Sequence, residues 1–283
     1  MRLETGVLGL VGALLSAAAC GSDGGAAGAA AATGQGGSAG SASAPGGGGS
    51  ASAAGASGPG PGAGGASSSP PQIGAHGLAY YRYQENFAAT IDSPSLVTQP
   101  AGSTLLVSAG RGDLGAFTLP SDNKGNSPFV ALERPHAYTN WASSGTAVYG
   151  LTGAVGGARH VVSNTNAPGD EITLAVVEVR NGVTIVDHSW VERLLGAGPI
   201  TSAPVTTTGP ATLVAFWWGD GGADGDKVAT PSDGFQVLDG IGLEGSLVQC
   251  YVAAREVTAA GTYDVTWDAT PPQGAQLWLV AVQ

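Results

Sequence analysis

Residues 21 to 70 constrain the fold of this chain more than any other feature, because they carry almost nothing that a core could bury. They are mostly Gly, Ala, Ser and Pro, with one charged residue, Asp23, and apart from proline no apolar side chain larger than alanine. Such a segment buries too little apolar surface to offset the entropy lost on ordering. We therefore expect residues 20 to 71 to be a disordered linker, and residues 72 to 283 to form the folded domain.

The residues before this linker have the pattern of an export signal. Arg2 supplies a positive charge, which Glu4 weakens, and residues 6 to 19 form an apolar stretch. This stretch is too short to span a bilayer and has the length of a secretory signal. We therefore expect residues 1 to 19 to be a signal peptide.

The three alanines at 17 to 19, followed by Cys20 and Gly21, resemble the lipobox of bacterial lipoproteins. That resemblance implies lipidation of Cys20, and a glycine after the cysteine is similar to the pattern that permits export to the outer membrane. Ala17 departs from the family pattern, which prefers leucine there. The alternative is an ordinary A-x-A cleavage site, which would leave a secreted or periplasmic protein with an incidental cysteine.

The pattern of residues 72 to 283 predicts an all-β fold. Short apolar or alternating runs are separated by Gly, Pro, Asn and Asp, and a helical turn is suggested only by "SWVERLLG". Tyr263, Val265 and Trp267 alternate with polar residues, which predicts a strand with one face in the core. Runs such as "TLAVVEV" and "LWLVAV" are apolar throughout and predict strands covered on both sides. This pattern indicates a sandwich or barrel.

Two segments, about 103–179 and 211–283, echo each other. "STLLVSAG" resembles "ATLVAFWW", "LPSDNKG" resembles "TPSDGFQ", and "EITLAVVEV" resembles "AQLWLVAVQ" with Glu171 matched to Ala275. We interpret them as related halves that share the core of one two-sheet β-sandwich, because neither has enough strands to bury both faces alone. The order of turns and strands resembles jelly-roll-type domains of bacterial secreted and phage structural proteins. That resemblance implies surface display and no assigned chemistry.

Charge and cysteine content exclude some classes of protein. The formal net charge is −11, from 10 basic and 21 acidic residues, which argues against nucleic acid as a partner. The two cysteines, Cys20 and Cys250, are too few for a disulfide framework. Cys250 alternates with valines in "SLVQCYVAA", so we expect a small buried side chain there.

The most site-like stretch is "WWGDGGADGDK". Asp220, Asp224 and Asp226 match three positions of a calcium-loop template, and carboxylates on a glycine-rich loop suit Ca²⁺. Gly222 stands where a ligand belongs, however, and Pro231 stands where a bidentate glutamate belongs. The alternative is a solvated hairpin loop.

Two further groups are candidates for ligand binding. Asp122 and Asn126 in "SDNKGN" could contact carbohydrate or metal, or could instead bond their own backbone in a turn with Gly125 at positive φ. An aromatic platform for sugars is suggested by Tyr138, Trp141, Trp217 and Trp218. Because adjacent strand residues point to opposite faces, we expect one of the paired tryptophans in the core and the other exposed.

Catalysis has little support. The chain lacks G-x-S-x-G, H-E-x-x-H and C-x-x-C, and its four histidines are scattered. We therefore expect a non-enzymatic cell-envelope lipoprotein that displays a binding module for carbohydrate or another surface ligand, with no cofactor unless Ca²⁺ binds. A self-associating structural surface protein is the alternative, and a cryptic hydrolase is a third hypothesis.

Overall fold

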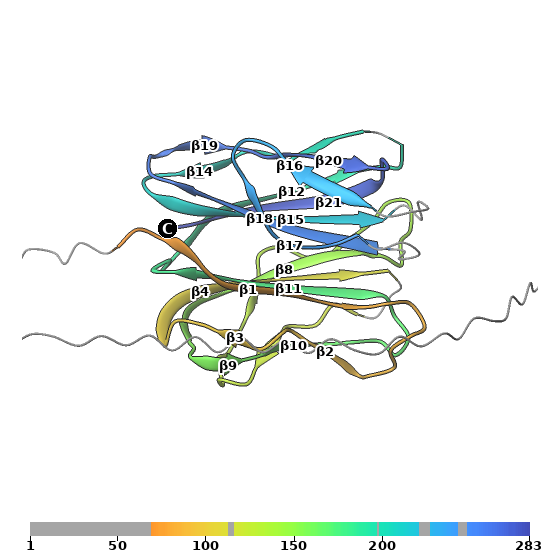
Figure 1. Ribbon diagram of the computed structural model, residues 1–283, viewed down its shortest axis with the longest axis horizontal. Helices are drawn as coiled ribbons and strands as arrows, with labels where there is room; N and C mark the ends of the chain where they lie inside the picture. Colours follow the sequence, from red (N-terminus) through yellow and green to blue (C-terminus); the bar gives the residue numbers. More distant parts are fainter. Residues whose placement is uncertain (1–68, 113–115, 197, 221–226, 243–247) are drawn as a thin grey trace, which may run out of the picture. The chain divides into compact units, whose positions relative to one another are not determined.

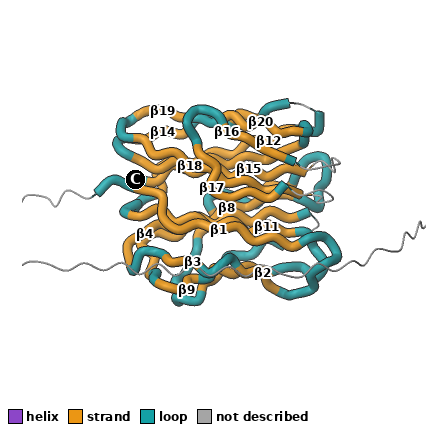
Figure 2. The backbone as a smooth tube through the Cα atoms, in the orientation of Figure 1, coloured by secondary structure: helices purple, strands orange, loops and turns teal. Residues whose placement is uncertain are grey.

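The computed structural model describes residues 69–112, 116–196, 198–220, 227–242 and 248–283. These residues belong to one compact unit, residues 63–283, and their regular structure is entirely β-strand (Figure 2). The all-β prediction is confirmed, while the helical turn suggested by "SWVERLLG" lies largely in a strand, Ile185–Arg193. In the part of the chain that the structure describes, no helix is long and apolar enough to cross a membrane.

The first half builds one large antiparallel sheet and two small ones. The first major sheet has the order β1-β11-β4-β8-β6, with β7 also paired to β8, and the small sheets have the orders β2-β10-β5 and β3-β9. The strands are β1 (Gln72–Tyr81), β2 (Thr90–Asp92), β3 (Leu96–Val97), β4 (Ala101–Arg111), β5 (Ser121–Asp122), β6 (Val130–Ala131), β7 (His136–Ala137), β8 (Gly145–Val155), β9 (Ala158–His160), β10 (Val162–Thr165) and β11 (Ile172–Arg180).

Apart from β7, the second half repeats this topology strand for strand. Its major sheet has the order β12-β21-β15-β18-β17, and its small sheets have the orders β13-β20-β16 and β14-β19. The strands are β12 (Ile185–Arg193), β13 (Ile200–Thr201), β14 (Val205–Thr207), β15 (Ala211–Asp220), β16 (Val228–Pro231), β17 (Gln236–Ile241), β18 (Val248–Val257), β19 (Gly261–Tyr263), β20 (Thr266–Thr270) and β21 (Gly274–Val282). Only β7 lacks a counterpart among the described strands. Because β1 holds the same place in the first major sheet as β12 holds in the second, the repeat begins at β1, upstream of residue 103.

The two major sheets lie face to face, and each carries its small sheets on the outer side (Figure 1). The expected shared core is present between them and contains Leu106 and Val177 from the first half and Phe216 and Val280 from the second. Each half also has a core of its own between its major and small sheets. The major sheets are therefore buried on both faces, which explains why their central strands are apolar throughout.

The register of the repeat differs by one residue from the sequence match of Glu171 with Ala275. The shared core receives Ala175, Val177 and Val179 from β11 and Trp278, Val280 and Val282 from β21. Val177 thus corresponds to Val280, 103 positions later. A one-residue shift exchanges the two faces of a strand, and because both faces of these strands are apolar, the sequence pattern could not fix it.

The edges of the two major sheets are joined by matching contacts between a histidine and a carboxylate. At one edge His76 Nδ1 of β1 lies 2.7 Å from Asp239 Oδ2 of β17. At the other edge His188 Nε2 of β12 lies 3.4 Å from Glu133 Oε1, just after β6. His76 pairs with Val177 and His188 with Val280, so the two histidines occupy equivalent places in the halves.

The strands give the domain two distinct ends. At the entry end, β1 begins at Gln72 beside the last residue of β11, Arg180. At the loop end, β1 finishes beside the start of β11, and β4 finishes at Arg111 beside Gly145, the first residue of β8.

Candidate functional site

The loop end contains a row of side chains that crosses the shared core. In the first major sheet Gly110 pairs with Thr173 on one side and Thr146 on the other. In the second, Trp218 pairs with Gln276 and Cys250. A Cβ atom at Gly110 would lie 2.3 Å from Trp218 Cδ1, so the glycine makes room for the indole of the facing sheet.

Trp217 and Trp218 point to opposite faces of β15, as expected, but the prediction that one of them is exposed is wrong. Trp217 packs in the outer core of the second half, and Trp218 packs with Tyr138 and Val248 at the loop end. Both are almost fully buried. The reason is the layering, because the second major sheet is covered on one side by the small sheets and on the other by the first half.

The expected aromatic platform reduces to one exposed ring backed by buried ones. Trp141 is 38% exposed, and its ring lies 5.6 Å from that of Tyr138, which is fully buried and 6.0 Å from Trp218. The Tyr138 hydroxyl donates to the carbonyl oxygen of Arg193 at 3.2 Å. Burial, together with the nearby charges of Asp220 and Glu192, raises the pKa of Tyr138 to about 12. Trp141 is therefore the aromatic side chain of this group that a ligand can reach.

Asp220 is the last residue of β15 and not part of an open loop. It is 7% exposed and pairs with Val248 and Gly274. Burial raises its pKa to about 7, a shift that a hydrogen bond with Ser144 opposes and the charge of Glu171 supports. Asp220 thus holds its proton close to neutral pH.

The other two candidate calcium ligands, Asp224 and Asp226, lie outside the described residues. Within the described ranges, no group of three or more His, Cys, Asp or Glu side chains is placed to hold a metal ion.

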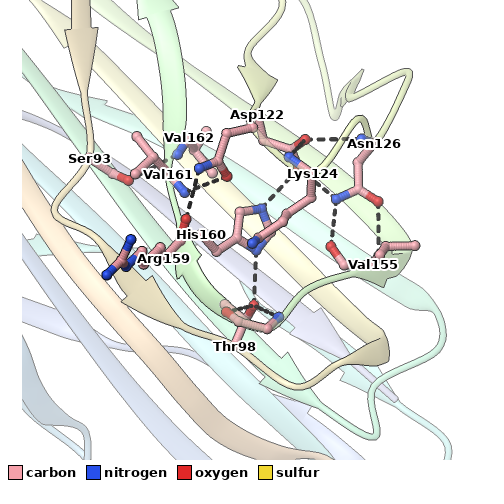
Figure 3. A network of polar contacts seen from close by, with 12 residues as sticks. Ser93, Thr98, Asp122, Lys124, Asn126, Val155, Arg159, His160, Val161 and Val162 are labelled. Atoms are coloured by element: carbon pink, nitrogen blue, oxygen red, sulfur yellow. Dashed lines mark hydrogen bonds and ion pairs between the residues drawn. The ribbon is translucent and has the colours of Figure 1, made fainter.

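Asp122 lies at the centre of a buried polar network that ties the small sheets of the first half together (Figure 3). His160 Nε2 lies 2.9 Å from Asp122 Oδ2, and His160 Nδ1 lies 2.9 Å from Thr98 Oγ1. The side chains of Asp122 and His160 are at most 1% exposed. The carboxylate, imidazole and hydroxyl form a chain typical of some catalytic sites, but they lie inside the fold, where substrate cannot reach them.

The same residues form the turn that was one of the two readings of "SDNKGN". Asp122 Oδ1 accepts the backbone N–H groups of Lys124 and Asn126, both at 3.0 Å, and Gly125 has φ of +77°. The Asn126 amide donates to Val155 O and accepts from Val155 N, both at 2.8 Å. Burial alone would raise the pKa of Asp122, but hydrogen bonds from Asn126, His160 and Lys124 outweigh it and lower the pKa.

Sequence reasoning did not connect His160 with this turn. The two carboxylate oxygens of Asp122 already accept hydrogen bonds from the turn and from His160, which lies 38 positions away. Since the spacing of the pair matches no known motif, the sequence carried no signal for it beyond the polar residues themselves.

Cys250 is buried in the shared core, as the alternation of its strand predicted. Burial raises the pKa of its thiol to about 12, and a hydrogen bond with Thr173 partly offsets the shift. A thiol that stays protonated in an apolar core is unreactive.

The sequence matched no model of a known protein family and no curated protein, and no solved structure matched the chain.

Proposed function

We propose that the chain is a cell-envelope lipoprotein whose β-sandwich is displayed on a flexible tether and binds a surface ligand, with carbohydrate the favoured class. The anchor would be a lipid on Cys20, and residues 20 to 71 would be the tether. The proposal assigns no catalytic turnover to the domain, and it places the domain outside the cytoplasm.

The main support for the proposal is that the attachment point of the tether and the exposed Trp141 lie at opposite ends of the domain. A tether that joins β1 at Gln72 attaches at the entry end, whereas Trp141 and Asp220 lie at the loop end. β1 has ten residues, so about 33 Å of strand separates these ends. An anchored domain of this kind would present its exposed tryptophan away from the membrane.

The tether has the length for this role. A Gly-, Ala- and Ser-rich segment of fifty residues has a root-mean-square reach of about 40 Å, which exceeds the length of β1. Carbohydrate is favoured because an exposed indole supported by a second aromatic ring offers a flat apolar face on which a sugar ring can stack.

Detergent-phase partitioning tests the anchor. We expect the full-length protein, expressed in a bacterium that processes lipoproteins, to enter the detergent phase and Cys20→Ala to stay in water. Cys250→Ala is the matched control and should partition like the parent protein. If the parent and Cys20→Ala both stay in the aqueous phase, lipidation is rejected.

Binding of the same protein to an array of immobilised envelope glycans tests the ligand. Trp141→Ala should lose about five- to 150-fold in affinity, because stacking of a flat ring on an aromatic side chain contributes on the order of 1–3 kcal/mol and every 1.4 kcal/mol is a factor of ten. Val183→Ala removes an exposed apolar side chain between β11 and β12, at the entry end, and should leave binding unchanged. Equal affinities for the parent and Trp141→Ala would contradict this site, and ligand-free assembly that grows with concentration would favour the self-associating alternative.

A further inference from the structure

A hydroxyl and a side-chain amide from opposite halves meet in the row that crosses the shared core. Thr146 Oγ1 of β8 donates to Gln276 Oε1 of β21 at 2.6 Å. Trp278 Nε1 donates to Thr146 Oγ1 at 2.8 Å, and Gln276 Nε2 donates to Glu192 Oε2 at 3.2 Å. Each polar group therefore has a single orientation, with the hydroxyl directed at the carbonyl end of the amide.

We propose that Thr146 and Gln276 form an intramolecular ester cross-link between the two halves of the domain. Thr146 Oγ1 attacks the amide carbon of Gln276, an O–C bond forms, and the C–N bond to Nε2 breaks. The products are the ester and one molecule of ammonia. Atoms and electrons balance with no oxidant, reductant or added acyl donor.

The hydroxyl proton passes from Oγ1 to the departing nitrogen, so that neutral ammonia leaves. Glu192 Oε2, which accepts hydrogen bonds from Nε2 and from the backbone N–H of Thr139, is the carboxylate beside the departing nitrogen. Two further titratable side chains lie near the pair. His136 is the cross-strand partner of Thr146, with its ring 5.3 Å from that of Trp278 and its Nε2 2.9 Å from Glu133 Oε2. Tyr138 is close enough for the charge of Glu192 to raise its pKa. Proximity and fixed orientation are what make such a transfer fast within one molecule.

Burial favours the cross-link twice. Thr146, Gln276 and Trp278 are each at most 1% exposed. Water is therefore kept from competing with the hydroxyl as the nucleophile, and it is also kept from hydrolysing the ester after it forms.

The repeat supplies an internal comparison. In the repeat, Thr146 corresponds to Cys250, which pairs with Trp218. Gln276 corresponds to Thr173, which pairs with Gly110. Cys250 and Thr173 are hydrogen-bonded to each other, but neither carries an amide. The equivalent pair therefore has no acyl group to transfer, and only one cross-link is expected.

Mass spectrometry of tryptic peptides from the folded full-length protein tests the proposal. Cleavage after Lys124, Arg159 and Arg255 yields peptides 125–159 and 256–283, which contain Thr146 and Gln276 respectively. We expect them to be joined, with a mass one ammonia below their sum. Hydroxylamine under denaturing conditions should separate them and leave a hydroxamate on Gln276, because hydroxylamine cleaves esters and leaves amides intact.

Variants separate the cross-link from an ordinary hydrogen bond. Thr146→Val should abolish the joined peptides, Thr146→Ser should retain them, and Glu192→Gln should slow their formation at least tenfold. Thr104→Val is the control, since Thr104 is a buried strand threonine whose hydroxyl donates to Gly182 O; its peptides should stay joined. Separate peptides at full mass from the folded parent protein would overturn the proposal, whatever the variants do.

Discussion

At the scale of single residues, burial decides what each candidate side chain can do. Asp122 and His160 satisfy each other inside the fold, Trp218 fills the space above Gly110, and Trp141 alone of its group meets solvent. Asp220 is the exception, because burial of its carboxyl group raises its pKa to about 7 despite a hydrogen bond with Ser144. That shift has a measurable consequence for stability.

Asp220 should make the domain less stable as the pH rises. A carboxyl whose folded pKa lies above its unfolded value of 3.8 binds its proton more tightly in the folded state. Its penalty is absent below the unfolded value, grows as the pH rises and is complete above about 7. Between about pH 5 and about pH 8, we expect the parent to lose on the order of 1–3 kcal/mol of unfolding free energy relative to Asp220→Asn.

Urea unfolding at both pH values measures this difference. Asp264→Asn changes an exposed aspartate and should track the parent protein. A constant gap between the parent and Asp220→Asn across the range would contradict the buried acid. Asp122 does not confuse the measurement, because its pKa is lowered from 3.8: its stabilising contribution is already present above that value and is lost only as the pH falls below it.

At the scale of elements, equivalent turns of the two halves have different duties. The "PSD" of the first half places Asp122 in a buried network that joins β3, β9 and the turn up to Asn126. The "PSD" of the second half leaves Asp233 exposed at φ of +60°, where its side chain contacts Ser232. The same short sequence therefore supports a structural centre in one half and a surface turn in the other.

Replacing each aspartate by asparagine should separate the two turns. Asp122→Asn puts an amide where a carboxylate accepts from His160 and Asn126, which leaves buried donors unpaired and should cost about 1–3 kcal/mol. Asp233→Asn keeps a residue that tolerates positive φ and should change stability by less than about 0.5 kcal/mol. Urea unfolding gives both values, and faster hydrogen exchange at the Val155 amide should accompany the first variant alone. Equal costs at the two sites would refute the distinction.

Elements were predictable from the sequence where the signal is local. Alternation in residues 263 to 267, the turn at Gly125 and the order of strands in both halves are encoded within a few residues each. The burial of Trp218 was not predictable, because it depends on the first half covering the inner face of the second major sheet. The pairing of Asp122 with His160 depends on tertiary contacts between separate strands, and no local pattern specifies those.

At the scale of the whole domain, the two halves have the topology of one unit repeated and the packing of two unlike partners. Each has an outer core of its own, yet the inner face of each major sheet is as apolar as the outer one and is covered only by the other half. The halves should therefore fold locally but depend on each other for solubility.

Separate expression of residues 69–184 and 185–283 tests this dependence. Each fragment alone should aggregate or bind a hydrophobic dye, because its inner face is exposed. Mixed or co-expressed, the two should form a soluble one-to-one complex, detected by size-exclusion chromatography with light scattering. A first fragment that stays monomeric and binds no dye would show that its inner face needs no partner.

The contact between Gly110 and Trp218 also decides which halves can pack together. If two copies of the first half packed face to face, Gly110 would lie opposite a second Gly110 and leave a void. If two copies of the second half did so, the indole of Trp218 would clash with a second Trp218. Only unlike copies complement each other. Two molecules of this chain can therefore exchange a half for its counterpart by domain swapping, but a half does not pack well against a second copy of itself, because Gly110 and Trp218 complement each other only across unlike halves.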